Sequence, residues 1–194
     1  MTEIFRVSGK AVTPYLAEVA ALRIKVFREF PYLYDGSEAY EREYLEAYAE
    51  SDRSVFVLAR IGGKIVGAST GLPLTDADEA FRKPFEAAGI DPATVFYFGE
   101  SVLEKQHRGQ GIGQRFFDER EAHARKLGCT VTAFCAVERD DDHPLKPGDY
   151  RSNDSLWIKR GYTKTPALKA ELEWEQIDQG ESRNTLIFWL KHWE

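Results

Sequence analysis

The chain has 194 residues, 43% of them hydrophobic and 30% charged, and a formal net charge of −6. This length and composition predict a single globular domain over residues 1–194 and exclude a disordered chain. The negative charge argues against a nucleic-acid partner, and the lack of a long apolar run or leader segment against a membrane partner, so we expect a soluble, cytoplasmic protein.

The N-terminal half is predicted to contain a strand, two helices and a hairpin. Pro14 favours the start of the first helix, a turn-rich segment at 30–36 separates it from the second, and Gly62-Gly63 is typical of a hairpin turn. The expected elements are a strand at 4–7, helices at 14–27 and 37–48, and paired strands at 54–60 and 64–71.

The C-terminal half alternates apolar strands with helical segments. Residues 75–90 are charged and rich in alanine, which favours an inserted helix or a long loop. Asn153 and Gly161 have the residue types of a helix cap and a helix end. The expected elements are buried strands at 95–103 and 130–137, helices at 114–127 and 154–160, a polar loop at 138–150, and late strands at 167–176 and 184–192.

A glycine-rich run, residues 108–113, connects the apolar strand at 95–103 to the following helix. Glycines let a backbone approach an anion closely, and the first turn of a helix offers N–H groups without partners. The run therefore predicts a phosphate-binding turn. Gln114 and Phe116 stand where a dinucleotide-binding fingerprint would need its last glycine, and no Gly-Lys-Ser/Thr follows, so a Rossmann site and a P-loop are excluded.

Arg108, Gly111 and Gly113 occupy the three defined positions of the pattern Arg/Gln-x-x-Gly-x-Gly/Ala. The segment thus resembles motif A of the GCN5-related N-acetyltransferase superfamily, and the order of elements agrees over nearly the whole chain. The resemblance implies an α+β fold with a central mixed, mostly antiparallel sheet flanked by helices, and acetyl-CoA as co-substrate without a metal. The pyrophosphate would then bind the backbone of Gly109, Gln110, Gly111, Ile112, Gly113 and Gln114, with positive charge from Arg108.

The resemblance also assigns roles to the strand before the glycine run. The backbone of Leu103 would bond the acyl-thioester carbonyl, and Ser101 and Val102 would pair with the pantetheine arm. Glu100 is the one carboxylate in this apolar strand, where a charge is costly unless it faces a cleft or a partner. Glu100 is therefore a candidate general base, with an ion pair to Arg23 or Arg28 as the equally weighted alternative.

The sequence departs from the family where a tyrosine commonly serves as general acid. That position is Trp157, which has no acidic proton, so it would pack against the cofactor arm or the core. Tyr150 can supply a hydroxyl from the polar loop, with simple packing as the alternative. Thiolate departure also needs no acid, because a thiol with a pKa of about 8.5 leaves tolerably as the anion.

The acceptor is expected to bind at the segment 30–36, where Tyr32 and Tyr34 would line a pocket or form a hydrophobic clasp between two helices. Cys129 and Cys135 are expected to be reduced core residues, and their spacing is not that of metal ligands. Neither has a partnered histidine at a recognisable spacing, so direct attack is favoured over an acyl-enzyme.

The favoured function is thus an N-acetyltransferase that moves an acetyl group from acetyl-CoA to a primary amine, most simply of a small molecule, although peptide N-termini remain open. The alternative is a non-catalytic acyl-CoA sensor, which the missing tyrosine at position 157 supports. A dinucleotide oxidoreductase conflicts with the single glycine turn and the hairpin. By analogy with the family, the late strands bury a homodimer interface or complete the core.

Overall fold

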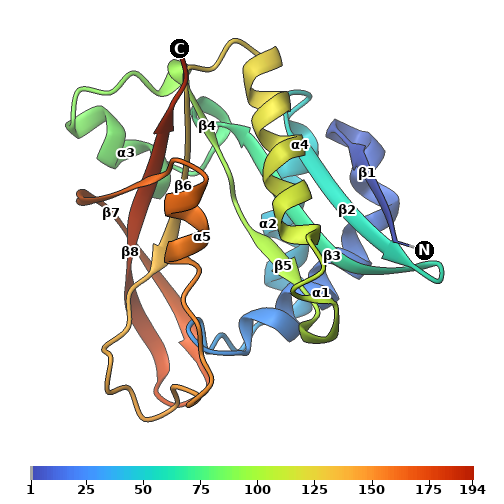
Figure 1. The fold of residues 1–194 in the computed structure, drawn as a ribbon, viewed down its shortest axis with the longest axis vertical. Coiled ribbons are helices and arrows are strands. Elements are labelled where there is room, and N and C mark those ends of the chain that lie inside the picture. The colour runs from blue at the N-terminus through green and yellow to red at the C-terminus, as the bar shows by residue number, and fades with distance from the viewer. Residues whose placement is uncertain (1) are drawn as a thin grey trace.

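The computed structural model describes residues 2–194 and contains one eight-stranded sheet (Figure 1). The strand order is β1-β2-β3-β4-β6-β8-β7, and β5 pairs with β3 outside this path. Only β4 and β6 run parallel, so the expected mixed, mostly antiparallel sheet is confirmed. The strands are β1 (Glu3–Val7), β2 (Val55–Ile61), β3 (Lys64–Pro73), β4 (Val95–Tyr97), β5 (Ser101–Leu103), β6 (Val131–Val137), β7 (Thr163–Gln176) and β8 (Gly180–His192).

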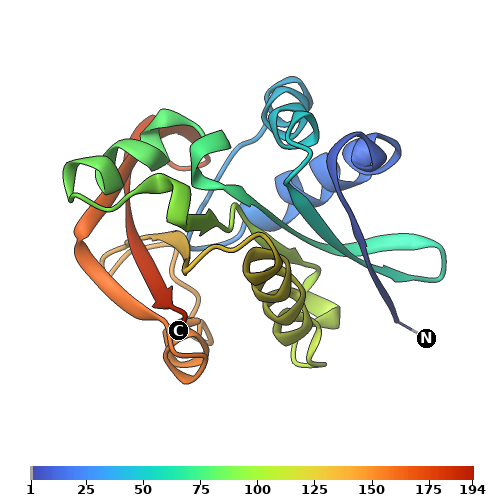
Figure 2. The ribbon, with the colours of Figure 1, turned by 90° about the horizontal axis from the view of Figure 1, so that it is seen from above.

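Helices cover both faces of the sheet. In Figure 2, α1, α2 and α3 lie on one face and α4 and α5 on the other. Each face has its own apolar core, with Val19, Leu45 and Phe85 in one and Phe116 and Trp189 in the other. The helices are α1 (Leu16–Phe27), α2 (Glu38–Glu50), α3 (Glu79–Ala87), α4 (Ile112–Lys126) and α5 (Asp154–Lys159).

Local sequence signals account for most element boundaries. The Ser37 side chain accepts a hydrogen bond from the Tyr40 N–H and caps α2, as expected of a serine before a helix. Pro14 does not begin an α-helix: the 3-10 helix η1 (Gly9–Tyr15) precedes α1, which begins at Leu16. None of the helices in residues 2–194 is long and apolar enough to cross a membrane.

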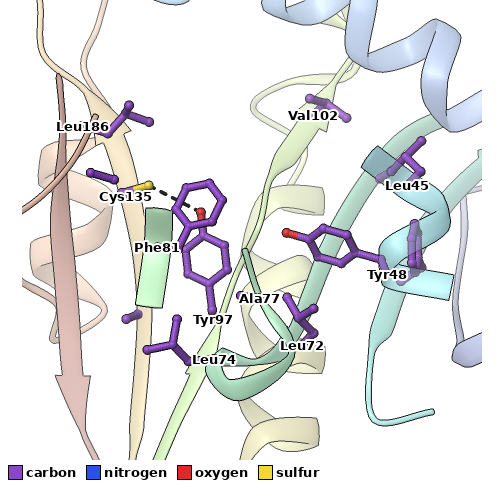
Figure 3. Packing of buried hydrophobic residues seen from close by; sticks show 14 of the residues in the cluster. Leu45, Tyr48, Leu72, Leu74, Ala77, Phe81, Tyr97, Val102, Cys135 and Leu186 are labelled. Atoms are coloured by element: carbon purple, nitrogen blue, oxygen red, sulfur yellow. Dashed lines mark hydrogen bonds between the residues drawn. The ribbon is translucent and has the colours of Figure 1, made fainter. Parts of the chain in front are cut away.

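The segment 75–90 contains a helix, α3, rather than a long loop. Its Phe85 ring contacts Phe188 of β8 edge-on, with centroids 4.9 Å apart, and its Phe81 ring stacks on Tyr97 of β4 at 4.7 Å. Figure 3 shows Phe81 over Tyr97, whose hydroxyl lies 3.4 Å from the Cys135 sulfur of β6. The inserted helix therefore completes the core on the α1–α2 face of the sheet.

The apolar stretch 95–103 forms two strands rather than the single strand that its sequence predicts. The N–H of Phe98 donates the last hydrogen bond to β6, at Ala133 O (2.8 Å), and Gly99 N then bonds Thr70 O of β3. A Cβ at Gly99 would lie 2.2 Å from the Tyr48 hydroxyl, so only glycine fits where the chain changes its partner from β6 to β3. Beyond the break β5 stays on β3 alone, and the sheet opens between β5 and the end of β6.

Candidate active site

The glycine run forms a tight turn that leads directly into α4. Gly109 and Gly111 have φ angles of 75° and 81°, the left-handed region that favours glycine, and Gly111 is the N-cap of α4. The first hydrogen bond of the helix joins Arg115 N to Gly111 O at 3.2 Å. The N–H groups of Ile112, Gly113 and Gln114 thus have no acceptor within the helix, and no acidic residue occupies its first turn.

The space around this turn fits a diphosphate. A Cβ built on Gly109, Gly111 or Gly113 meets no other atom within 4 Å. Packing within the protein therefore does not demand a glycine at position 113, whereas a closely bound ligand would. A hollow of about 370 Å³ lies beside the turn and is lined by Thr2, Ile4, Gln110, Gly111, Ile112 and Arg115. Unpaired N–H groups and open space are the two features that an anion cradle requires.

The Arg108 side chain does not point into this cradle, which differs from the expected role. Its Nε donates to the carbonyl of Leu103 at 3.0 Å, and its Nη1 pairs with Glu29 at 2.9 Å. The backbone of Leu103 faces away from β3, so its carbonyl has no strand partner there and the guanidinium supplies one. In this structure Arg108 joins the end of β5 to Glu29, just beyond α1, and its guanidinium is not turned toward the glycine turn.

The hydrogen bonds of β5 show which of its backbone groups are available. Glu104 N donates to Val66 O at 3.0 Å, and Thr70 N donates to Glu100 O at 3.1 Å. Because bonded and non-bonded pairs alternate in an antiparallel ladder, Val102 bonds to Ala68 of β3. In this structure the Val102 backbone therefore faces β3, and not the opening where a pantetheine arm was expected to pair with it. The backbones of Ser101 and Leu103 face the opening toward β6, and we call these groups the free edge of β5.

Glu100 lies at the break between β4 and β5, and its side chain is only 1% exposed. Arg23 of α1 pairs with its Oε2 at 2.6 Å, and the Tyr44 hydroxyl donates to the same oxygen at 3.4 Å. Arg23 also pairs with the buried Glu41 of α2. Of the two ion-pair partners considered from the sequence, Arg23 is the one present, since Arg28 pairs with Asp35.

Charge and burial oppose each other in this cluster. Burial by itself would lower the pKa of Arg23, but the carboxylates of Glu100 and Glu41 hold it well above its ordinary value. Burial raises the pKa of Tyr44, which therefore stays protonated and donates. The second oxygen of Glu100, Oε1, is buried and has no hydrogen-bond partner within residues 2–194. A buried acceptor without a partner is costly, which makes this oxygen a candidate for ligand contact.

Residues 21–146 match the model of the family described as Acetyltransferase (GNAT) family. The chain belongs to this family. It is an acetyl-CoA-dependent acyltransferase with the acetyltransferase fold. No curated protein matches its sequence.

Solved structures show the same fold at low sequence identity. The yncA protein of Salmonella typhimurium, in a structure with its cofactor acetyl-CoA, has a TM-score of 0.60 and 14% identity over 100% of this chain and 94% of that one. The ribosomal-protein-alanine N-acetyltransferase of Brucella melitensis has a TM-score of 0.60 and 16% identity over 98% and 99% of the two chains. An acetyltransferase of the GNAT family from Streptococcus pneumoniae has the same score and identity over 100% of both chains.

In this acetyltransferase the segment 30–36 is fixed against the late strands. Tyr34 forms a β-bridge with Gln176 of β7, and Arg139 donates to the carbonyls of Pro31 and Tyr32. Tyr34 is 9% exposed, and Tyr32 is partly buried with its hydroxyl close to the backbone of Val137. The segment is thus a clasp between distant elements, and through Tyr32 it also reaches the end of β6 that borders the opening.

Tyr150 and Trp157 occupy different surroundings. Tyr150 packs edge-on against Phe30 with ring centroids 4.8 Å apart, so the polar loop folds over the same segment. Burial, followed by the nearby Asp154, raises the pKa of its hydroxyl. Trp157 contacts Phe134 and Trp189 at 4.9 and 5.1 Å, so it has a core-packing role.

Arg120 of α4 lies beside the free edge, is 1% exposed, and is not among the site residues expected from the sequence. It follows the buried Phe116 by four positions, on the face of α4 that packs against the sheet. An arginine on an apolar helical face was the available signal. Within residues 2–194, no group of three histidine, cysteine, aspartate or glutamate side chains is placed to hold a metal ion.

Proposed function

We propose that the protein is an N-acetyltransferase that acetylates a primary amine of a small molecule by direct attack in a ternary complex. The observation that carries the proposal is the split strand. Its free edge at Ser101 and Leu103 leads, within one short turn, into the open glycine cradle at residues 109–114. A diphosphate site followed by backbone groups without a strand partner suits a long acyl-CoA arm.

The backbone provides most of the acetyl-CoA site. The N–H groups of the cradle, Gln110 to Gln114, would hold the pyrophosphate, as the resemblance implies. When bound, acetyl-CoA supplies the acetyl group as an activated thioester. The acyl end is the end of the arm far from the pyrophosphate, and Ser101 is the free-edge residue farther along the chain from the cradle. We therefore assign the thioester carbonyl to the Ser101 N–H and the arm to Leu103, which reverses the expected roles.

Glu100 is the proposed acceptor of the amine proton, directly or through water. Arg23 and Tyr44 hold its Oε2, which leaves the unpartnered Oε1 as the atom for this role. Tyr32, Tyr34 and Tyr150 are the proposed acceptor contacts. Tyr32 and Tyr34 belong to the segment 30–36, Tyr150 packs against Phe30 of the same segment, and its hydroxyl is proposed as an additional donor.

Direct attack is supported by the state of the two cysteines. Both are buried, and burial raises the pKa of the Cys135 thiol to about 12. A thiol with so high a pKa stays protonated near neutral pH and is a poor nucleophile. The amine itself is therefore the proposed attacking group, and no acyl-enzyme forms.

The acceptor class and the setting of the enzyme complete the proposal. The Brucella melitensis neighbour is named for an acceptor on a ribosomal protein. We propose a small amine as the acceptor of this chain, and the net charge of −6 suits a cationic acceptor of this kind. The proposed setting is cytoplasmic, without nucleic-acid or membrane partners, and β7, a partly exposed strand at the edge of the sheet, allows a homodimer.

A thiol-release assay with acetyl-CoA and a panel of primary amines tests the function. The proposal predicts amine-dependent release of free thiol by the wild-type protein. Glu100→Gln should lower kcat by about 100-fold or more while acetyl-CoA still binds, since general bases contribute roughly 10² to 10⁴ in rate. A protein that binds acetyl-CoA but releases no thiol with any amine, peptide N-termini included, would instead be the acyl-CoA sensor.

A further inference from the structure

Arg120 is a buried cation. Within residues 2–194, no carboxylate lies within 4.0 Å of its guanidinium to form an ion pair. Its guanidinium donates to the carbonyls of Thr70 (3.2 Å), Glu100 (3.0 Å) and Phe116 (3.2 Å), and to the Ser101 hydroxyl at 2.7 Å. It also lies over the rings of Phe98 and Phe117, at 4.2 and 5.0 Å. All four hydrogen-bond acceptors are uncharged, so the positive charge is not neutralised locally.

The four hydrogen bonds and two ring contacts partly offset the free-energy cost of burying the Arg120 charge. Burial lowers the pKa of Arg120 to about 10, which still leaves the group cationic at neutral pH. A buried charge without a counter-ion costs several kcal/mol in proteins. Two of its acceptors, the carbonyls of Thr70 and Glu100, belong to the strands at the break. Arg120 therefore stabilises the break between β4 and β5, and its positive charge polarises the polar groups that it contacts.

Ser101 is the exposed neighbour of this charge. Its side chain lies on the face that packs against α4, and its backbone is part of the free edge. Because Arg120 donates to the hydroxyl oxygen, the hydroxyl proton is left to be donated elsewhere, and the positive charge makes it a stronger donor. Because Trp157 stands where the family commonly has a tyrosine, this chain lacks that hydroxyl as a donor to the leaving sulfur. A hydroxyl on the face of the sheet that packs against α4 would take over this role.

We propose that the Ser101 hydroxyl is a catalytic hydrogen-bond donor to the leaving sulfur, and that Arg120 is the positioning residue that polarises it. In this step the amine nitrogen bonds to the acyl carbon and the carbon–sulfur bond breaks. The electron pair goes to the sulfur, which leaves as a thiolate, while the amine proton goes to Glu100 or water. Ser101 keeps its proton. This inference rests on the proposed acetyl transfer.

Substitutions at Ser101 test the hydroxyl without removing the backbone N–H. With the best amine of the panel, Ser101→Ala should lower kcat by about tenfold or more, as for a lost donor to a developing negative charge. The dissociation constant of acetyl-CoA, measured by calorimetry, should stay within about twofold because the edge backbone is retained. Ser101→Thr keeps the hydroxyl and should restore most of kcat.

Ser69 provides the matched control. It lies opposite Ser101 in the β3–β5 pairing, and its buried hydroxyl has no partner in the described part of the chain. Ser69→Ala removes a hydroxyl from the same strand pair but not from the free edge, so kcat should not change. Arg120→Gln should lower kcat as Ser101→Ala does. If that variant does not fold, the Ser101 and Ser69 variants still decide the question.

The outcomes separate this inference from the proposed function. If the wild-type protein acetylates no amine, the proposed function is wrong and the inference falls with it. If the wild type is active and Ser101→Ala retains its kcat, only the inference is overturned. Equal losses in Ser101→Ala and Ser101→Thr would also overturn it, because the hydroxyl would then not be the group that matters.

Discussion

Gly111 begins α4 with a φ of 81° and has open space where a Cβ would point. Gly128, just beyond the other end of the same helix, has a φ of 79° and is equally open. Alanine at either position should therefore destabilise the fold similarly, by about 1 kcal/mol, through backbone strain alone. Only Gly111→Ala places a methyl group at the cradle, so it should weaken acetyl-CoA binding by about tenfold or more.

Calorimetric titration of both variants, with urea unfolding of each, separates strain from ligand contact. Equal acetyl-CoA affinities in Gly111→Ala and Gly128→Ala would show that Gly111 serves only the turn.

The state of Cys135 can be measured directly. With its pKa raised to about 12, the thiol is protonated at pH 8 in the folded protein, whereas an unfolded cysteine with a pKa near 8.5 is partly ionised there. A raised folded-state pKa adds stability below about pH 8.5, which is lost as the pH rises toward 12. Cys135 should therefore resist a chromogenic disulfide reagent at pH 8 and react fully in guanidinium chloride. Rapid native labelling of Cys135 with loss of activity would contradict the direct-attack account.

Residue types in the sequence predicted the glycine turn before α4 better than they predicted the side-chain partners. Gly111 could be located because a tight turn between a strand and a helix often needs a positive φ angle, which glycine adopts without strain. The orientation of Arg108 could not, because its partners, Leu103 O and Glu29, depend on how α1 meets β5. Glu100 was recognised as a costly charge, but the choice of Arg23 over Arg28 follows from the packing of α1.

At the scale of elements, apolar composition predicted a strand at 95–103 but not its interruption. Its residues are apolar or aromatic except Gly99, Glu100 and Ser101, and the break lies at these exceptions, so the glycine inside the strand was the available signal. The break follows from contacts made by distant parts of the chain: Tyr48 of α2, Thr70 of β3 and Arg120 of α4 meet at Gly99 and Glu100. The resemblance to the acetyltransferase family did predict that backbone groups of this strand would be free to pair with a ligand.

Helix α3 should contribute to stability but not to acetyl-CoA binding. Its Phe85 is fully buried against Phe188, on the face of the sheet opposite α4. Phe85→Ala should lower the free energy of unfolding by about 3 to 5 kcal/mol because it leaves a cavity. Urea denaturation measures this loss, and calorimetry on the folded variant should return the wild-type dissociation constant for acetyl-CoA. A tenfold weaker affinity would show that α3 takes part in the binding site.

At the scale of the whole molecule, element order predicted the architecture because each element has a strong local signal and the order resembles one known fold. The long-range clasp could not be predicted this way. Arg139 connects the segment 30–36 to Gln176 and Asn184, residues far apart in the sequence whose contacts follow only from the assembled sheet. The clasp fixes Tyr32 near the opening, which ties the proposed acceptor side to the late strands.

The central claim is that the glycine turn and the free edge of β5 form an acyl-CoA site. The most direct test is a calorimetric titration of acetyl-CoA into the purified wild-type protein, with NAD as the control ligand. The account predicts one acetyl-CoA per chain with a micromolar dissociation constant, and no heat of binding for NAD. A folded protein that binds no acetyl-CoA would contradict the account, because the cradle would then be only a turn between a strand and a helix.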